Sequence, residues 1–220
     1  MFGIVVALYS EAEKLLNHLE DKSEFLLADK KAYSGKLCSH QAIVVISGIG
    51  KVSAALTTQK IIDTYNPEFI LNFGTAGGMN KSVDILKYYA VDKCCQFDFD
   101  LRELDGVPLG FIQEYKTAYF PTETTRIDFL PKSSLASADR FTNDENDIAS
   151  INEIKCSLRD MEGGAIAQVC LSNNVPLYMI KGITDVYGSG TAQEQFFENL
   201  KRVSDGFPNI ILKAITEILK

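Results

Sequence analysis

The sequence predicts a three-layer α/β fold, in which a central mixed, largely parallel sheet is flanked by helices. Two observations indicate this class. Apolar runs typical of buried strands alternate with segments whose apolar residues recur at helical spacing. Small residues and glycines follow several of the apolar runs, as they do where open α/β sheets bind ligands. The 220 residues are enough for one large domain over residues 1–220, with two small domains as the alternative.

Seven apolar runs are expected to form strands. An uninterrupted run such as Gly3–Leu8 is typical of a strand that is buried on both faces. Shorter runs bounded by turn residues complete the set. In chain order the expected strands are Gly3–Leu8, Ala32–Leu37, Ala42–Ile46, Glu68–Asn72, Tyr89–Cys95, Lys132–Ala138 and Leu177–Ile180.

The helices follow from apolar residues at helical spacing, such as Leu15, Leu16 and Leu19, which would share one face. The expected helices begin near Ser10, after Gly50, after Glu162 and near Pro208, and the last continues to the C-terminus. The segment Phe97–Thr125 has little periodicity. Because long irregular segments in compact domains are often functional, we expect it to cover the substrate or to form an interface.

Composition excludes several classes of function. A net charge of −7 and a pI near 4.9 argue against binding to nucleic acid or to an anionic membrane surface. Neutral or cationic ligands suit this balance better. No apolar run approaches the roughly 20 residues that span a bilayer, and the apolar start reads as a first strand and not as a signal peptide.

The five cysteines are scattered and show no C-x-x-C spacing. With only two histidines in the chain, neither a metal site nor a disulfide framework is indicated. Reduced thiols in a cytoplasmic protein are the expected state.

The segment Arg159-Asp160-Met161-Glu162-Gly163-Gly164-Ala165 carries two carboxylates at the start of an expected helix. Free N–H groups and the helix dipole can hold a carboxylate there, ready for a ligand. The simpler interpretation is that both acids only cap the helix.

Ser47-Gly48-Ile49-Gly50-Lys51-Val52-Ser53 resembles two phosphate-binding loops, but it departs from both. Val45 and Val52 break the G-x-x-x-x-G-K-[S/T] pattern, and Ser53 replaces the third glycine of G-x-G-x-x-G. We reject both interpretations. A tight turn for close packing and a ligand-facing loop remain open.

Three further segments carry candidate chemistry. Phe73–Gly78 follows an apolar strand and brings one hydroxyl, that of Thr75, to a glycine-rich loop. Asp185 follows the strand Leu177–Ile180, where it suits either proton chemistry or a turn. Glu11 follows the first strand and, taken alone, reads as an acid in the first turn of a helix.

Taken together, these segments resemble the 5′-methylthioadenosine/S-adenosylhomocysteine nucleosidase family of the nucleoside phosphorylase superfamily. The resemblance covers nearly the whole chain. It rests on Gly3–Glu11, Ser47–Val52, Gly74–Gly78, Ser137–Phe141, Met161-Glu162 and Thr184-Asp185-Val186, in that order.

The resemblance implies hydrolysis of an N-glycosidic bond, which releases adenine from a ribosyl thioether. Asp185 stands at the position of the acid that protonates purine N7, and Glu11 at that of the carboxylate that accepts a proton from the attacking water. This is the two-carboxylate logic of glycoside hydrolysis. It requires Asp185 to be held protonated while Glu11 stays ionised.

The resemblance also implies the substrate contacts. Glu162 would accept hydrogen bonds from the ribose hydroxyls, and its position at a helix end would keep it ionised. Phe141 would stack on the base, and the backbone of Thr142 would read the edge of the base. The remaining residues implied in substrate binding are Leu8, Ile49, Thr75, Ala76, Gly77, Met161, Lys181 and Phe196.

The nucleophile is expected to be water. The phosphorylases of the superfamily hold phosphate with a Gly-Asp-Pro turn and an arginine, whereas this chain has Glu11 near the first position and Asn72 at the second. A carboxylate at Glu11 would repel phosphate. The expected partners are therefore a purine nucleoside and water, without cofactor or metal.

Three departures from the family pattern concern the sugar and the 5′ group. Lys181 replaces an arginine and lacks its planar fork, and Leu8-Tyr9 replaces Met-Glu. The irregular segment keeps only an acid-x-acid pattern at Asp98-Phe99-Asp100. By family likeness the protein is a homodimer, in which Leu101 and Leu104 would line the 5′ pocket of the neighbouring subunit.

Two alternatives remain. One is another purine nucleosidase or phosphorylase of the same fold, acting on adenosine, inosine or a futalosine-type nucleoside. The other is a nucleoside-binding protein without catalysis, which the presence of both candidate carboxylates argues against.

Overall fold

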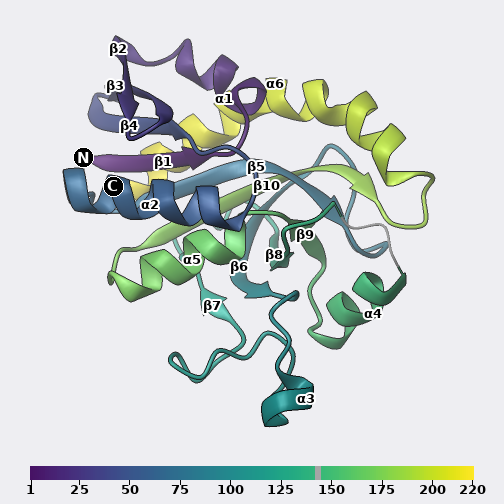
Figure 1. The fold of residues 1–220 in the computed structure, drawn as a ribbon. Helices are drawn as coiled ribbons and strands as arrows, with labels where there is room; N and C mark the ends of the chain where they lie inside the picture. Colours follow the sequence, from purple (N-terminus) through teal and green to yellow (C-terminus); the bar gives the residue numbers. More distant parts are fainter. Residues whose placement is uncertain (142–144) are drawn as a thin grey trace.

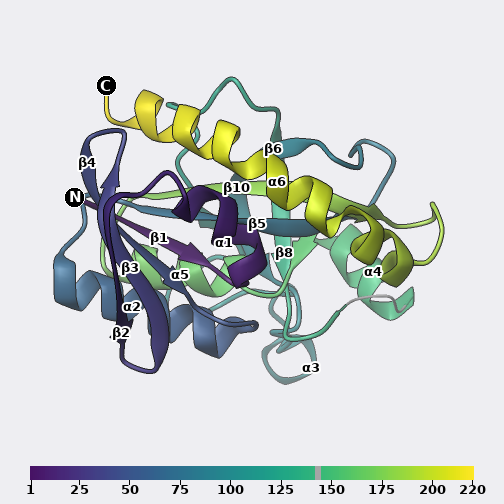
Figure 2. The ribbon, with the colours of Figure 1, turned by 90° about the horizontal axis from the view of Figure 1, so that it is seen from above.

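The computed structural model describes residues 1–141 and 145–220. Within these residues, ten strands form one mixed sheet (Figures 1 and 2). The strands are Phe2–Val6 (β1), Glu20–Leu27 (β2), Lys30–Leu37 (β3), His40–Ile46 (β4), Ile70–Gly78 (β5), Tyr88–Gln96 (β6), Phe120–Pro121 (β7), Lys132–Ser137 (β8), Leu158–Asp160 (β9) and Leu177–Val186 (β10). Parallel pairing joins β4, β1, β5 and β10, and the hairpins of β2, β3 and β4 are antiparallel.

Five of the strands close on themselves. β5 pairs with β10, β10 with β6, β6 with β8, β8 with β9, and β9 returns to β5. In the last step Gly77 pairs with Arg159 and Gly78 with Leu158. The carboxyl ends of β5 and β10 therefore lie beside β9, so the residues that follow β9 face those ends.

Helices cover both faces of the sheet, which confirms the three-layer α/β class (Figure 1). Those described are Tyr9–Leu16 (α1), Lys51–Tyr65 (α2), Arg102–Asp105 (α3), Glu145–Glu153 (α4), Gly163–Ser172 (α5) and Ala192–Ile218 (α6). α2 and α5 pack on one face, and α1 and α6 on the other. No helix in the described part of the chain is long and apolar enough to cross a membrane.

The first strand shows why its sequence is apolar throughout. Val5 packs into the core beneath α2 and α5, whereas Ile4 and Val6 pack with Leu15 of α1 and Phe207 of α6. All five residues of β1 are buried. A strand between two helical layers has no face left for water, so alternation of polar and apolar residues is absent.

The seven predicted strands are present, but two elements extend further than expected. Phe73–Gly78 and Lys181–Val186 were predicted to follow strands, and both belong to strands. β5 and β10 remain paired as far as Gly78 and Val186, with an irregularity between Ile183 and Asp185. Backbone pairing continues through small and polar residues, although their side chains give no apolar signal.

The last helix was also predicted wrongly, because it begins at Ala192 and contains Pro208. Proline removes one backbone hydrogen bond from a helix. Here Val203, Phe207 and Ile211 are fully buried around it, and this packing holds the helix across the proline.

Strands β2 and β9 and helix α4 were not predicted. β2 is an exposed edge strand rich in charged residues, and β9 is only three residues long. The segment Phe97–Thr125 is irregular as expected and contains α3 and β7. Among the described residues it contributes nothing to the lining of the main pocket of its own chain.

Candidate active site

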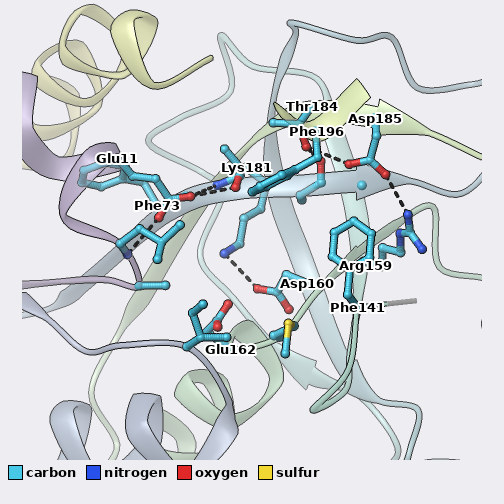
Figure 3. Close-up of a pocket in the computed structure, with 18 of the residues that line it drawn as sticks. Glu11, Phe73, Phe141, Arg159, Asp160, Glu162, Lys181, Thr184, Asp185 and Phe196 are labelled. Atoms are coloured by element: carbon cyan, nitrogen blue, oxygen red, sulfur yellow. Dashed lines mark hydrogen bonds and ion pairs between the residues drawn. The ribbon is translucent and has the colours of Figure 1, made fainter. Parts of the chain in front are cut away.

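A pocket of about 320 Å³ opens at the carboxyl ends of β1, β5 and β10 (Figure 3). This is where ligands bind in open α/β sheets, and the volume is within the range of small-molecule sites. Its described lining consists of Ala7, Leu8, Glu11, Ile49, residues 72–77, Arg140, Phe141, residues 159–162, Lys181, Thr184, Asp185 and Phe196.

Glu11 lies in the first turn of α1 with its carboxylate against β5. The backbone N–H of Thr75 donates to Glu11 Oε1 at 2.7 Å, and Thr75 Oγ1 donates to the same atom at 2.8 Å. A Cβ at Gly74 would lie 3.2 Å from Glu11 Oε1, so glycine leaves the room that this approach needs. Burial raises the pKa of Glu11 above its usual value, while the bonds from Thr75 and the charge of Lys181 oppose the shift.

Lys181 is a buried cation beneath the pocket. Its Nζ lies 2.9 Å from Asp160 Oδ2, and both side chains are at most 3% exposed. Burial opposes the charge on Lys181, but the carboxylates of Asp160, Glu162 and Glu11 outweigh it, and the pKa of Lys181 is raised. The charge of Lys181 therefore offsets the three buried acids, which would otherwise be costly to keep away from water.

Asp160 caps helix α5. The backbone N–H of Gly163 donates to Asp160 Oδ2 at 2.9 Å, and Ser137 Oγ donates to Oδ1 at 2.5 Å. The capping interpretation is therefore correct for Asp160, which in addition holds Lys181. Its contribution to the pocket had not been predicted.

Glu162 does not cap helix α5 as Asp160 does. Its side chain makes no capping bond to α5, and its Oε1 instead accepts the backbone N–H of Gly50 at 2.8 Å. Burial and the charge of Asp160 raise the pKa of Glu162 to about 7, against the opposing effects of Lys181 and Gly50. Burial therefore works against the expected ionisation of Glu162, and the donor that favours its carboxylate is the N–H of Gly50 and not the end of helix α5.

The glycine loop between β4 and α2 therefore supports the pocket. Gly48 and Gly50 both have positive φ, at 82° and 97°, which turns the chain so that the N–H of Gly50 faces Glu162. Ile49 between them is 56% exposed and lines the pocket. Of the two interpretations left open, the structure favours the ligand-facing loop.

At the other end of the pocket, Asp185 has a partner that was not predicted. Arg159 Nη2 lies 2.7 Å from Asp185 Oδ2, and Thr184 Oγ1 donates to Oδ1 at 2.8 Å. A Cβ at Gly77 would lie 2.5 Å from Arg159 Nε and 2.8 Å from Asp185 Oδ2. Glycine at this position is what allows the two charged groups to meet against β5.

Two aromatic rings form the mouth of the pocket. Phe141 and Phe196 meet edge to face, with their ring centroids 5.9 Å apart. The guanidinium carbon of Arg159 lies 5.5 Å from the centroid of Phe141 (Figure 3). A flat apolar ligand could lie against the half-exposed ring of Phe141, near Arg159 and Asp185.

The pocket brings together most of the predicted site residues. They are Leu8, Glu11, Ile49, Thr75, Ala76, Gly77, Phe141, Met161, Glu162, Lys181, Asp185 and Phe196. Leu101 directly precedes α3, and Leu104 belongs to it. Both lie away from the pocket of their own chain, and Leu104 is 77% exposed. Thr142 lies outside the described residues.

Arg159 is the main residue that sequence reasoning missed. It belongs to β9, where it is only 5% exposed. In the sequence, a charged residue next to Asp160 and Glu162 is expected to lie at a solvent-exposed helix start. The only available signal was that it directly precedes the acid pair, which does not distinguish a buried arginine from an exposed one.

The fold and this pocket define a member of the phosphorylase superfamily, whose family model matches residues 1–217. A 5′-methylthioadenosine/S-adenosylhomocysteine nucleosidase of Buchnera aphidicola is 32% identical, over 98% of this chain and 99% of the relative. One from Bacillus thuringiensis is 28% identical, over 98% of each chain. The chain belongs to the 5′-methylthioadenosine/S-adenosylhomocysteine nucleosidase family.

Solved structures agree with this assignment. A nucleosidase of that name from Colwellia psychrerythraea, in complex with adenine, has a TM-score of 0.90 at 25% identity and covers 98% of this chain and 94% of its own. Futalosine hydrolase of Helicobacter pylori also has a TM-score of 0.90, at 26% identity, and covers 98% and 97%.

Proposed function

We propose that the protein hydrolyses the N-glycosidic bond of 5′-methylthioadenosine, S-adenosylhomocysteine or a closely related 5′-substituted purine nucleoside. The observation that carries this proposal is the arrangement of three acids in one pocket. Glu11 and Asp185 lie at opposite ends, and Glu162 lies along the floor between them (Figure 3). A ribose needs hydrogen-bond acceptors at its hydroxyls, and a glycosidic bond needs an acid on one side and a base on the other.

In the proposed reaction, water attacks C1′ of the ribose and gives a proton to Glu11. The bond from C1′ to N9 breaks, and its electron pair leaves with the purine. Thr75 holds the carboxylate of Glu11 in place, and burial, which raises the pKa of Glu11, makes it a stronger base towards the proton of the attacking water.

Asp185 is the proposed donor to purine N7. Arg159 Nη2 lies 2.7 Å from Asp185 Oδ2 and fixes the position of the carboxyl group. Thr184 donates to its other oxygen and orients the carboxyl group. Phe141 is proposed to stack on the base, Phe196 to close over the ribose or the 5′ group, and Met161 to pack beside the sugar.

Water is the proposed nucleophile in preference to phosphate. The sugar end of the pocket contains the acids Glu11 and Glu162, which offer no positive charge to hold an anion. Lys181, the cation nearest to them, is paired with Asp160. Free purine should be released at the same rate with and without inorganic phosphate, whereas strict dependence on phosphate would make the protein a phosphorylase.

A small panel of nucleosides tests the whole proposal. Release of free purine from 5′-methylthioadenosine, S-adenosylhomocysteine, adenosine and inosine would be followed by chromatography. Hydrolysis of the 5′-thio substrates supports the proposal. Binding of all four without turnover would instead support a nucleoside-binding protein.

We extend the proposal to the assembly and its location. Val52 and Leu56 of α2 are 79% and 50% exposed, which suits a homodimer interface, and in such a dimer Leu101 and Leu104 could reach the partner's 5′ pocket. The five cysteines are unpaired, which is compatible with the cytoplasm. The continuous sheet from β2 to β10 suits a single domain over residues 1–220.

A further inference from the structure

Three charged residues beside the pocket form a closed network that the proposed reaction does not use. Lys51 Nζ lies 2.6 Å from Asp98 Oδ1, and Asp98 Oδ2 accepts the backbone N–H of Asp139 at 3.1 Å. Asp139 Oδ1 in turn accepts the backbone N–H of Lys51 at 2.7 Å. None of these three described residues belongs to the lining of the pocket. Their effect on a substrate must therefore pass through their neighbours.

The network joins three segments that are far apart in the sequence. Lys51 is the first residue of α2, Asp98 lies two residues after β6, and Asp139 lies two residues after β8. The side chains of Lys51 and Asp98 are only 17% and 15% exposed, so this ion pair is better shielded from water than an ordinary surface pair. The lysine of the loop that resembles a phosphate-binding loop thus holds a carboxylate of its own chain.

At the sugar end of the pocket, the network sets the position of Gly50. Gly50 is the N-cap of α2 and has no side chain to cap the helix, so Asp139 bonds the first N–H of the helix from another segment. A Cβ at Gly50 would lie 3.0 Å from Asp139 Oδ1, so the carboxylate packs against the backbone of Gly50. Because the N–H of Gly50 donates to Glu162 Oε1, a shift of Asp139 would move the donor that holds Glu162.

At the base end, the same network anchors the chain that leads to Phe141. Asp139 is bonded through both its backbone N–H and its carboxylate, and Phe141 follows two residues later. The ring of Phe141 lines the pocket and is 50% exposed. Packing alone fixes a half-exposed ring poorly, so its position depends on the anchored residues before it.

We propose that Asp139 is a positioning residue, held by Lys51 and Asp98, that keeps Glu162 in place for the ribose and Phe141 in place for the base. This inference rests on the proposed function, because it concerns the substrate contacts of the same site. Both contacts hold the substrate and neither touches the bond that breaks. Loss of the network should therefore raise KM more than it lowers kcat.

Steady-state hydrolysis of 5′-methylthioadenosine tests the proposal. Asp139→Ala should raise KM by about tenfold or more, with a smaller change in kcat. Asp139→Asn keeps an oxygen that accepts the N–H of Lys51 and should restore most of the affinity. Lys51→Met removes the cation from Asp98 and should shift KM in the same direction as Asp139→Ala. Asp21→Asn is the matched control, because it breaks the exposed pair with Lys36 away from the pocket and should leave both parameters unchanged.

Adenine, which has no ribose, tests the base end separately. Its calorimetric binding should weaken in Asp139→Ala. At the sugar end, combining Asp139→Ala with Glu162→Gln should raise KM by less than the product of the two single effects, because both changes act on the same hydrogen bond. Thermal unfolding verifies that each variant is folded under the assay conditions.

An unchanged KM or an unchanged adenine affinity in folded Asp139→Ala would overturn the inference. Failure of the wild-type enzyme to release base from 5′-methylthioadenosine would instead refute the proposed function. Calorimetric binding of 5′-methylthioadenosine would then decide the role of Asp139, with weaker binding by Asp139→Ala supporting it and equal binding overturning it.

Discussion

Lys181 Nζ lies 2.9 Å from Asp160 Oδ2, and this buried ion pair joins strand β10 to the last residue of strand β9, shortly before helix α5. Its position decides the electrostatics of the whole sugar end of the pocket. Lys181 also interacts with the charges of Glu11 and Glu162, and Asp160 raises the pKa of Glu162. Changes at this ion pair should therefore alter the stability of the protein. They should also alter the pKa values of Glu11 and Glu162, which are proposed to contact water and ribose.

Lys181→Met should destabilise the protein strongly. It would leave Asp160 buried with an uncompensated charge, and breaking a buried pair in this way costs about 3–5 kcal/mol. The free energy of unfolding in urea measures the effect. Lys181→Arg preserves the charge and is the matched control, which should retain most of the stability. Equal stability of Lys181→Met and wild type would contradict the assigned role of the pair.

Glu162→Gln should stabilise the protein at alkaline pH. The pKa of Glu162 is about 7 in the folded protein, against a reference value of 4.5, so the folded state binds the proton more tightly. The stability of wild type should therefore fall as pH rises from 4.5 to about 7, by about 3 kcal/mol at most.

Glutamine cannot ionise, so the variant escapes this loss. Urea unfolding at about pH 5 and about pH 8 checks the sign: the advantage of Glu162→Gln over wild type should be large at the higher pH and small at the lower. An advantage that is independent of pH would show that burial does not raise the pKa of Glu162. Activity should decrease in the same variant, because a neutral amide accepts hydrogen bonds from ribose more weakly.

Glu11→Gln should abolish most of the turnover while nucleoside binding persists. A general base contributes about 10²- to 10⁴-fold to the rate, and an amide cannot accept the proton from water. Single-turnover kinetics and calorimetric binding separate the two effects.

Thr75 offers a graded companion to this experiment. Thr75→Ser retains the hydroxyl that donates to Glu11 and should remain active, whereas Thr75→Val removes that hydroxyl and should lower kcat. If Thr75→Val matched Thr75→Ser, the hydroxyl would have no part in positioning Glu11.

Asp185→Asn should eliminate turnover while the protein still folds, with lower stability because buried Arg159 loses its charged partner. The amide can still accept the donor from Arg159 through its oxygen, but it has no carboxyl proton to give to N7. Purine release reports the activity, and thermal unfolding serves as the control for folding. Near-normal activity would remove Asp185 from its proposed role.

Several features of the fold were predictable because they depend on local composition. Apolar runs such as that of β1 identify strands buried on both faces, and helical spacing in α1 identifies the neighbouring layer. Predictions failed where pairing or packing with distant segments decides the structure. β5 continues through Phe73–Gly78 because β10 pairs with it, and α6 continues through Pro208 because its apolar face is buried.

The sequence by itself determined the α/β class, the family and most of the residues that line the pocket, because these follow from periodicity and from motifs in order along the chain. Only the tertiary structure decided how the charged groups are paired. Arg159 reaches Asp185 across the β5–β9 pairing, and Lys181 reaches Asp160 across the floor of the pocket. The charge state of a buried acid depends on its distance from partners that lie far away in sequence, and residue order does not encode that distance directly.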